Sequence, residues 1–154
     1  FHNSGSPSGV SIQVIMPGLN EFTAAMEKVF NAADPDGLAL FAAFKSMPLA
    51  EDTPARAMQL AASLREFRGS AHLIAIRAVG LTSKQAHYVK RPNDVKGFGW
   101  GEDDAPVVDD QVRALMVEAE KLTDALCIPA YSVLNEAERK ALVDGAKAFE
   151  SALK

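Results

Sequence analysis

The sequence has very little cysteine and no long hydrophobic run. Cys127 is the only cysteine in the 154 residues, so no internal disulfide and no CxxC-type zinc or redox site can form. A single cysteine favours a reducing compartment, and we expect a cytoplasmic location. The longest uncharged apolar stretch, residues 10–19, includes Pro17 and Gly18 and is far shorter than the roughly 20 residues that cross a bilayer. We therefore expect no membrane-spanning helix and no membrane partner.

The composition also lacks the bias of disordered or fibrous chains. Apolar residues make up 48% and charged residues 23%, and the 10 glycines show no collagen period, so one sizeable core can form. Residues 1–9 are the exception, because they are rich in Ser, Gly and Asn without the basic and apolar regions of a signal peptide. Alternation at Val10, Ile12 and Val14 predicts a short strand. We expect a flexible leader over residues 1–18 and a helical, helix-turn-helix-like domain over residues 19–154.

Helix start and stop signals recur along the rest of the chain. The predicted starts are Asn20, Asp34-Pro35, Thr53-Pro54, Ser70, Thr82 with Gln85 as a capping box, Pro106, and Asn135 with Glu138 as a second capping box. The predicted stops are Ala33, Pro48, Gly69, Gly80, Pro92 and Pro129. Apolar residues follow the helical period between these signals. The sequence therefore predicts an all-α fold with at most a short β-hairpin.

Charge is distributed unevenly. Residues 65–96 hold seven basic and two acidic side chains, a local charge of +5, whereas the whole chain carries −4. The rest of the chain therefore carries −9. This basic third either meets a polyanion such as DNA or forms a solvated helical face with Arg stems packed on the core.

A helix-turn-helix pattern lies inside the basic third, over residues 70–90. Such a motif needs an apolar first helix, a turn that glycine commonly permits, and apolar positions on the inner side of the second helix. Ala75, Ile76 and Val79, then Gly80, then Ala86 and Val89 meet these needs. The outer side of the second helix would present Ser83, Lys84, His87, Tyr88 and Arg91, which we take as candidate DNA-binding residues.

The segment that follows, residues 92–101, stands where a winged helix places its hairpin. Val95, Phe98 and Trp100 alternate imperfectly, so a shortened hairpin or an irregular loop fits the pattern. The glycines here are not a phosphate-binding loop, because no strand precedes them and no Walker lysine follows. Phe98 and Trp100 either cover the core or stack on a ligand, and Trp100 is a candidate ligand-binding residue.

A polar cluster precedes the motif. Arg65 and Arg68 are spaced i, i+3 and could converge with His72 on a small anion, while Glu66 either orients His72 or forms a structural pair with one arginine. We take Arg65, Glu66, Arg68, His72 and Trp100 as candidate ligand-binding residues. No nucleophile stands at a motif-specific spacing and no set of metal ligands is evident, so we predict no catalytic residues, no metal site and no cofactor.

The same cluster carries a more specific pattern: Leu64-Arg65-Glu66-Phe67-Arg68-Gly69-Ser70-Ala71-His72, followed by Gly80-Leu81, Gly99-Trp100 and Glu120-Lys121-Leu122-Thr123-Asp124. This pattern resembles the second half of an actinobacterial helix-turn-helix family that is similar to MarR-type winged helix-turn-helix regulators. The family signature reads approximately R-E-H-R-G-D-G-H, from which Phe67, Ser70 and Ala71 depart. The resemblance covers roughly residues 35–154. It implies a helix-turn-helix ancestry, a dimer built on the last two helices, and a further helical portion in front.

Two functional classes stay open. The first is a MarR-like regulatory or ligand-sensing protein that binds DNA and a small anionic or apolar effector, as a homodimer or with the N-terminal portion that family members carry. The second is a small-molecule binding protein or enzyme on the same helical scaffold that has lost DNA binding. The acidic residues of the 102–110 segment weigh against tight DNA binding, because regulators place Arg or Lys on their wings.

Overall fold

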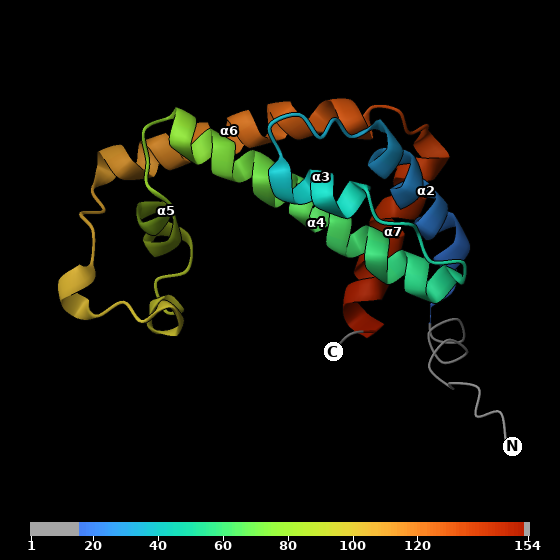
Figure 1. The fold of residues 1–154 in the computed structure, drawn as a ribbon, viewed down its shortest axis with the longest axis horizontal. Coiled ribbons are helices and arrows are strands. Elements are labelled where there is room, and N and C mark those ends of the chain that lie inside the picture. Colours follow the sequence, from blue (N-terminus) through green and yellow to red (C-terminus); the bar gives the residue numbers. More distant parts are fainter. Residues whose placement is uncertain (1–15, 153–154) are drawn as a thin grey trace, which may run out of the picture. The chain divides into compact units, whose positions relative to one another are not determined.

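The computed structural model describes residues 16–152, apart from the side chain of Glu102, and the structural statements below concern this part of the chain. It contains six α-helices, two short 3₁₀ helices and no strand (Figure 1). The helices are α2 (Leu19–Ala32), α3 (Ala39–Lys45), α4 (Thr53–Ala78), α5 (Ser83–Lys90), η1 (Val95–Phe98), η2 (Glu102–Asp104), α6 (Asp110–Tyr131) and α7 (Glu136–Ala152). The predicted all-α class is confirmed. The strand predicted at Val10, Ile12 and Val14 lies outside the described residues.

The chain divides into two compact units. The first contains the described residues up to Phe67 together with those from Pro129 onward, and the second is Arg68–Ile128. The boundaries fall inside α4 and α6, so each of these two helices contributes residues to both units. No described helix is long and apolar enough to cross a bilayer.

The first unit is built on the packing of α2 against α7. The rings of Phe22 and Phe149 lie 5.7 Å apart. Gly145 of α7 is buried opposite Phe22, and a Cβ atom placed on Gly145 would lie 2.4 Å from that ring. The glycine therefore permits a close helix–helix approach that a larger residue would block.

Three phenylalanines extend the same core. Phe41 of α3 is fully buried, with its ring centroid 6.0 Å from that of Phe30 and 4.9 Å from that of Phe67. Rings at these separations gain contact energy beyond their buried area. Burial of Phe41 thus helps to hold the short helix α3, which at seven residues is too short to be stable by helix propensity alone.

The second unit has a core of small and medium side chains from α4, α5, α6 and the turn between α4 and α5. Its members are Ala75, Ile76, Leu81, Ala86, Val112, Met116 and Ala119, with Val79, Val89, Val108 and Leu115 packed against them. Three alanines among the seven buried members bring the helix backbones close together. This core fixes α5 against α4 and α6.

The turn between α4 and α5 has the predicted chemistry. Gly80 adopts a left-handed conformation, with φ of 86°, and α4 ends in a Schellman motif in which Leu81 N donates to Ile76 O at 3.0 Å. The capping box at the start of α5 is present: Gln85 N donates to Thr82 Oγ1 at 3.1 Å, and Thr82 N donates to Gln85 Oε1 at 3.0 Å. Together these contacts build a helix-turn-helix.

Two predicted helix breaks are wrong. Gly69 and Ser70 lie inside α4, which continues for 26 residues. A glycine in a helix costs only about 1 kcal/mol, and burial of the flanking Phe67 and Ala71 offsets this cost. Pro129 lies inside α6, two residues before its end, where the missing N–H costs a single hydrogen bond near the helix terminus.

Three predicted helix starts are also misplaced. The helix predicted to start at Pro106 begins later, at Asp110. The N-cap of α2 is Gly18 rather than Asn20, which lies within the helix. Asp34-Pro35 does not open a helix: Asp34 Oδ1 accepts from Asp36 N at 2.9 Å, forming an Asx turn, and α3 begins later, at Ala39.

The hairpin considered for residues 92–101 does not form. Residues Val95–Phe98 make one 3₁₀ turn, which ends at Gly99 with φ of 71°. The alternative, an irregular loop, describes the segment better, because the glycines interrupt the alternation that a strand requires.

Candidate functional site

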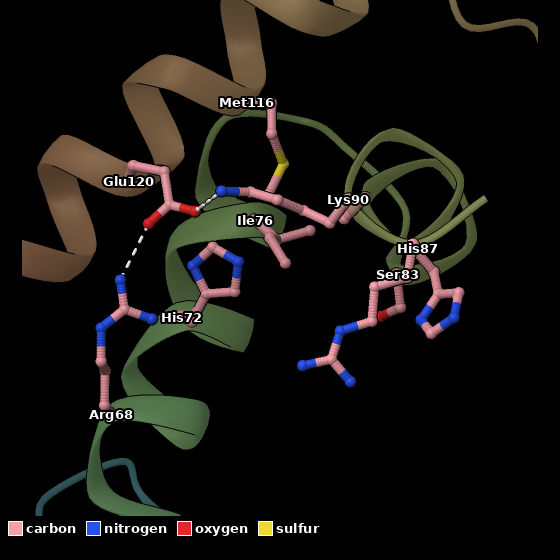
Figure 2. Close-up of a pocket in the computed structure, with 10 residues that line it drawn as sticks. Arg68, His72, Ile76, Ser83, His87, Lys90, Met116 and Glu120 are labelled. Atoms are coloured by element: carbon pink, nitrogen blue, oxygen red, sulfur yellow. Dashed lines mark hydrogen bonds and ion pairs between the residues drawn. The ribbon is translucent and has the colours of Figure 1, made fainter. Parts of the chain in front are cut away.

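A cavity of about 450 Å³ opens in the second unit (Figure 2). Its apolar lining comes from all three helices that form this unit's core. The lining residues are Arg68, His72 and Ile76 of α4, Ser83, Ala86, His87 and Lys90 of α5, Arg91 just after it, and Met116 and Glu120 of α6. The cavity is therefore bounded on one side by the second helix of the helix-turn-helix.

Glu120 receives two cations. Arg68 Nη2 donates to Glu120 Oε2 at 2.9 Å, and Lys90 Nζ lies 2.5 Å from Glu120 Oε1 (Figure 2). The hydrogen bond from Lys90, followed by that from Arg68, holds the pKa of Glu120 below its usual value against the opposing effect of burial. Glu120 is therefore ionised at neutral pH and links α4, α5 and α6.

His72 has a defined tautomer. Its Nδ1 lies 2.8 Å from Thr123 Oγ1, and the Thr123 hydroxyl donates its only hydrogen to Ala119 O at 2.7 Å. This direction of the Thr123 hydrogen bond favours the tautomer in which Nδ1 carries the proton and donates to Thr123. Burial lowers the pKa of His72, with Glu120 opposing and Arg68 and Lys90 adding to the effect, so the neutral ring predominates at pH 7 with a lone pair on Nε2.

The cavity has an excess of positive charge. Arg68, Lys90 and Arg91 line it, whereas Glu120 is the one acidic residue among the described residues that line it. Asp124 lies outside the lining, 3.9 Å from Arg68. Arg91 is exposed and has no ion-pair partner among the side chains that the structure describes. A negatively charged group would therefore be stabilised in this cavity.

The other side of α5 is covered by the segment that follows it. Tyr88 stacks on Trp100 at 5.9 Å, and Lys84 Nζ lies 5.2 Å from the Trp100 ring centroid and 3.7 Å from Asp104. His87 meets the rings of Phe98 and Trp100 edge-on, at 4.5 and 5.7 Å. His87 Nε2 and the Tyr88 hydroxyl are buried and have no hydrogen-bond partner among the described residues. Trp100 therefore covers one side of α5 and does not line the charged cavity.

The structure distributes the predicted site residues differently from the sequence. Of the candidate ligand-binding residues, Arg68 and His72 line the cavity, whereas Arg65 and Glu66 pair with each other at 3.1 Å in the first unit. Of the candidate DNA-binding residues, Ser83, His87 and Arg91 line the same cavity, whereas Lys84 and Tyr88 contact Trp100. Two groups of residues that the sequence treats as separate sites thus meet in one place.

Sequence reasoning missed two charged residues of the cavity, Lys90 and Glu120. Lys90 stands at i+7 from Ser83 on α5, and this helical spacing could have placed it beside Ser83 and His87. Glu120 is 52 residues from its partner Arg68, and no local pattern relates the two. Within the described residues no group of three or more His, Cys, Asp or Glu side chains could hold a metal ion.

The comparison with protein families decides the kind of protein. A model described as a helix-turn-helix family matches residues 10–100, more than half of the chain. The chain belongs to this helix-turn-helix family. The matched region includes α4, the Gly80 turn and α5, so the family assignment agrees with the geometry. No curated protein and no solved structure matches the chain.

Proposed function

We propose that this helix-turn-helix protein binds DNA as a MarR-like transcription regulator whose activity a small ligand controls. The observation that carries the proposal is a complete helix–turn–helix, with a Schellman end, a capping box and a basic second helix, in a chain of this family. In such motifs the second helix enters the major groove. The single buried cysteine agrees with a reducing, cytoplasmic setting.

The exposed residues of α5 support a particular DNA-facing side. Ser83, Lys90 and Arg91 are exposed, whereas Lys84 and Tyr88 are half-buried against Trp100. We expect Arg91 and Lys90 to contact phosphates and Ser83 to reach a base edge or a phosphate. Lys84 and Tyr88 would then position α5 rather than touch DNA.

Salt-dependent DNA binding tests this proposal. Fluorescence anisotropy with random duplex DNA at about 50 and 200 mM salt should show binding that weakens steeply, because each phosphate contact releases counterions. Arg91→Ala should reduce the slope of log K against log salt by about one. Lys84→Ala should change it little, and Lys147→Ala, an exposed position in the first unit, serves as the control. If no binding is detected at the lower salt concentration, this chain does not bind DNA by itself.

Ligand binding without DNA binding is the second candidate function, and the charged cavity is the observation that favours it. The −9 carried outside residues 65–96 repels a polyanion but hardly affects a small ligand held within the cavity. Under this candidate the chain is a small-molecule binding protein or an enzyme, and the DNA experiment gives no signal while a ligand still binds. The two outcomes separate the candidates.

A homodimer is part of the MarR-like proposal. In the second unit Leu122 and Leu126 of α6 are 42% and 49% exposed, and in the first unit Val143 of α7 is 52% exposed. Exposed apolar residues on one side of a helix favour association. Sedimentation velocity at micromolar concentrations should show twice the mass of the chain, and a monomer at the highest concentration would remove the dimer from the proposal.

A further inference from the structure

We propose that the cavity between α4, α5 and α6 is a binding site for a small oxyanion, a carboxylate or a phosphate, that also carries an O–H group. The inference deepens the proposed function, because it names the class of ligand and its binding residues. Only the regulatory consequence rests on DNA binding. Binding of the anion itself does not require it.

The two arginines of the cavity have hydrogen-bond donors that Glu120 does not occupy. Both contacts of Arg68, to Glu120 and Asp124, use the same nitrogen, Nη2. No hydrogen bond from Nε or Nη1 of Arg68 is formed among the described residues. A guanidinium has five N–H donors, so Arg68 can hold a second oxyanion while it keeps Glu120. Arg91 is free of ion pairs in the described part of the chain and supplies a second fork.

The other ring nitrogen of His72, Nε2, forms no hydrogen bond within the part of the chain that the structure describes, and it sets a further requirement on the ligand. Because Nδ1 donates to Thr123, the neutral ring offers Nε2 as an acceptor. An acceptor beside arginine and lysine suits a ligand that combines negative charge with an O–H donor. A hydroxy acid and a singly protonated phosphate both have this combination.

Protonation of His72 can strengthen the binding of the anion. The charged groups around His72 are Arg68 on its own helix, Lys90 on α5 and Glu120 on α6. A bound anion adds a second negative charge beside the ring and therefore favours the imidazolium form. The imidazolium would then donate from Nε2 to a ligand oxygen instead of accepting from the ligand O–H, and the added charge attraction should tighten binding as the pH falls towards 6.

The size and floor of the cavity limit the ligand. A volume of about 450 Å³ lies within the range of small-molecule sites. Ile76, Ala86 and Met116 provide an apolar surface, so a short hydrocarbon portion fits beside the charged groups. The site thus favours a small organic anion over a fully polar polymer.

Occupancy has a direct consequence for DNA binding. Ser83, Lys90 and Arg91 line the cavity and also form the exposed side of α5. A small anion and a DNA phosphate would use the same arginine, and we expect them to compete. This mode of regulation requires no movement of α5.

Calorimetric titration of the full chain without DNA tests the site. The probes are inorganic phosphate, malate, and succinate, which lacks the hydroxyl of malate. At pH 7.5, where His72 is neutral, malate should bind more tightly than succinate, and malate should bind more tightly at pH 6 than at pH 7.5. Arg68→Ala and Arg91→Ala should each weaken malate binding by about 10- to 100-fold, since a charge-assisted hydrogen bond contributes about 1.5–3 kcal/mol.

Two further variants keep the test decisive. Glu120→Gln removes the competing carboxylate, so it should tighten malate and phosphate binding several-fold, which a merely destabilised protein would not do. Lys121→Ala, next to Glu120 but exposed and paired with Glu118, should change nothing. Absence of binding by phosphate and malate at millimolar concentration overturns the proposal, and so does weaker binding in Glu120→Gln or an equal loss in Lys121→Ala. Because DNA is left out, this result is independent of the DNA experiment.

Discussion

The two units of the molecule use their interiors differently. The first buries large apolar side chains, and its groove of about 540 Å³ is lined mainly by apolar residues such as Phe22, Met26, Leu142 and Phe149. The second has a core rich in alanine beside a cavity that carries three cations and one carboxylate. Burial of apolar side chains stabilises a fold, whereas an excess of charge of one sign destabilises it. Such an excess is expected at a binding site. Substitutions in the first unit should therefore affect stability, and substitutions in the second should affect binding.

The largest expected effect breaks the packing of the first unit. Gly145→Val adds a branched side chain at a position where a Cβ atom alone would lie 2.4 Å from the Phe22 ring. Either the ring or α7 must move, and such overpacking costs about 1–3 kcal/mol, with further loss because valine is a poor fit to the helix. We expect a drop of about 3 kcal/mol in the free energy of unfolding, measured by urea denaturation.

The matched control is Gly69, the other glycine that lies in an α-helix of the described residues. Gly69→Ala in α4 meets no atom within 4 Å of its new Cβ, so helix propensity should raise the free energy of unfolding by about 0.5–1 kcal/mol. The double variant Gly145→Ala with Phe22→Ala should lose less free energy of unfolding than the sum of the losses in the two single variants, because the clash disappears with the ring. Additive losses would mean that Gly145 and Phe22 are not in contact.

A smaller effect compares one helix cap from each unit. Thr82→Ala and Asn135→Ala each remove a side-chain oxygen that accepts from a backbone N–H, at 3.1 and 2.9 Å. Each should lower the free energy of unfolding by about 1 kcal/mol. Only Thr82→Ala should also weaken ligand or DNA binding, because it loosens α5. Equal binding by both variants would show that the start of α5 does not position the cavity residues.

These caps also show what the sequence could predict about the fold. Gly80, Thr82 with Gln85, and Asn135 with Glu138 were predicted correctly, because capping depends on residues three positions apart and needs no distant partner. Gly69 and Pro129 have the local pattern of helix ends, yet both helices continue through them because of tertiary packing. A helix-breaking residue gives a local cost, and the sequence does not show how much burial opposes it.

The candidate site shows the same limit. Arg68 with His72, and Ser83 with Arg91, were found as local patterns on two helices, and these residues meet in one cavity. Their meeting depends on the small core residues that set the distance between α4 and α5. Glu120 comes from a third helix, so its pairing with Arg68 and Lys90 is a property of the fold alone.

The smallest effect concerns the pH dependence of the second unit. Burial lowers the pKa of His72 in the folded state, so the unfolded chain binds the proton more readily. Stability therefore falls as the pH drops below the ordinary histidine value of about 6.5. The pKa of Glu120 is lowered too, so the stability from its ionised form is lost only at more acidic pH.

Urea denaturation of the wild type and of His72→Gln at about pH 7.5 and pH 5.5, on either side of the ordinary histidine pKa, isolates this effect. At the higher pH the difference between the two proteins reports the lost contact with Thr123, whereas its change between the two pH values reports the titration of His72 alone. We expect the difference in the free energy of unfolding between the wild type and His72→Gln to become smaller at the lower pH. Saturating malate should restore part of this difference in the free energy of unfolding, because an anion in the cavity stabilises the protonated ring. The difference in the free energy of unfolding between the two proteins could instead be the same at both pH values, with and without malate. His72 would then not couple proton binding to the cavity. The second unit would in that case differ from the first in charge but not in its response to pH.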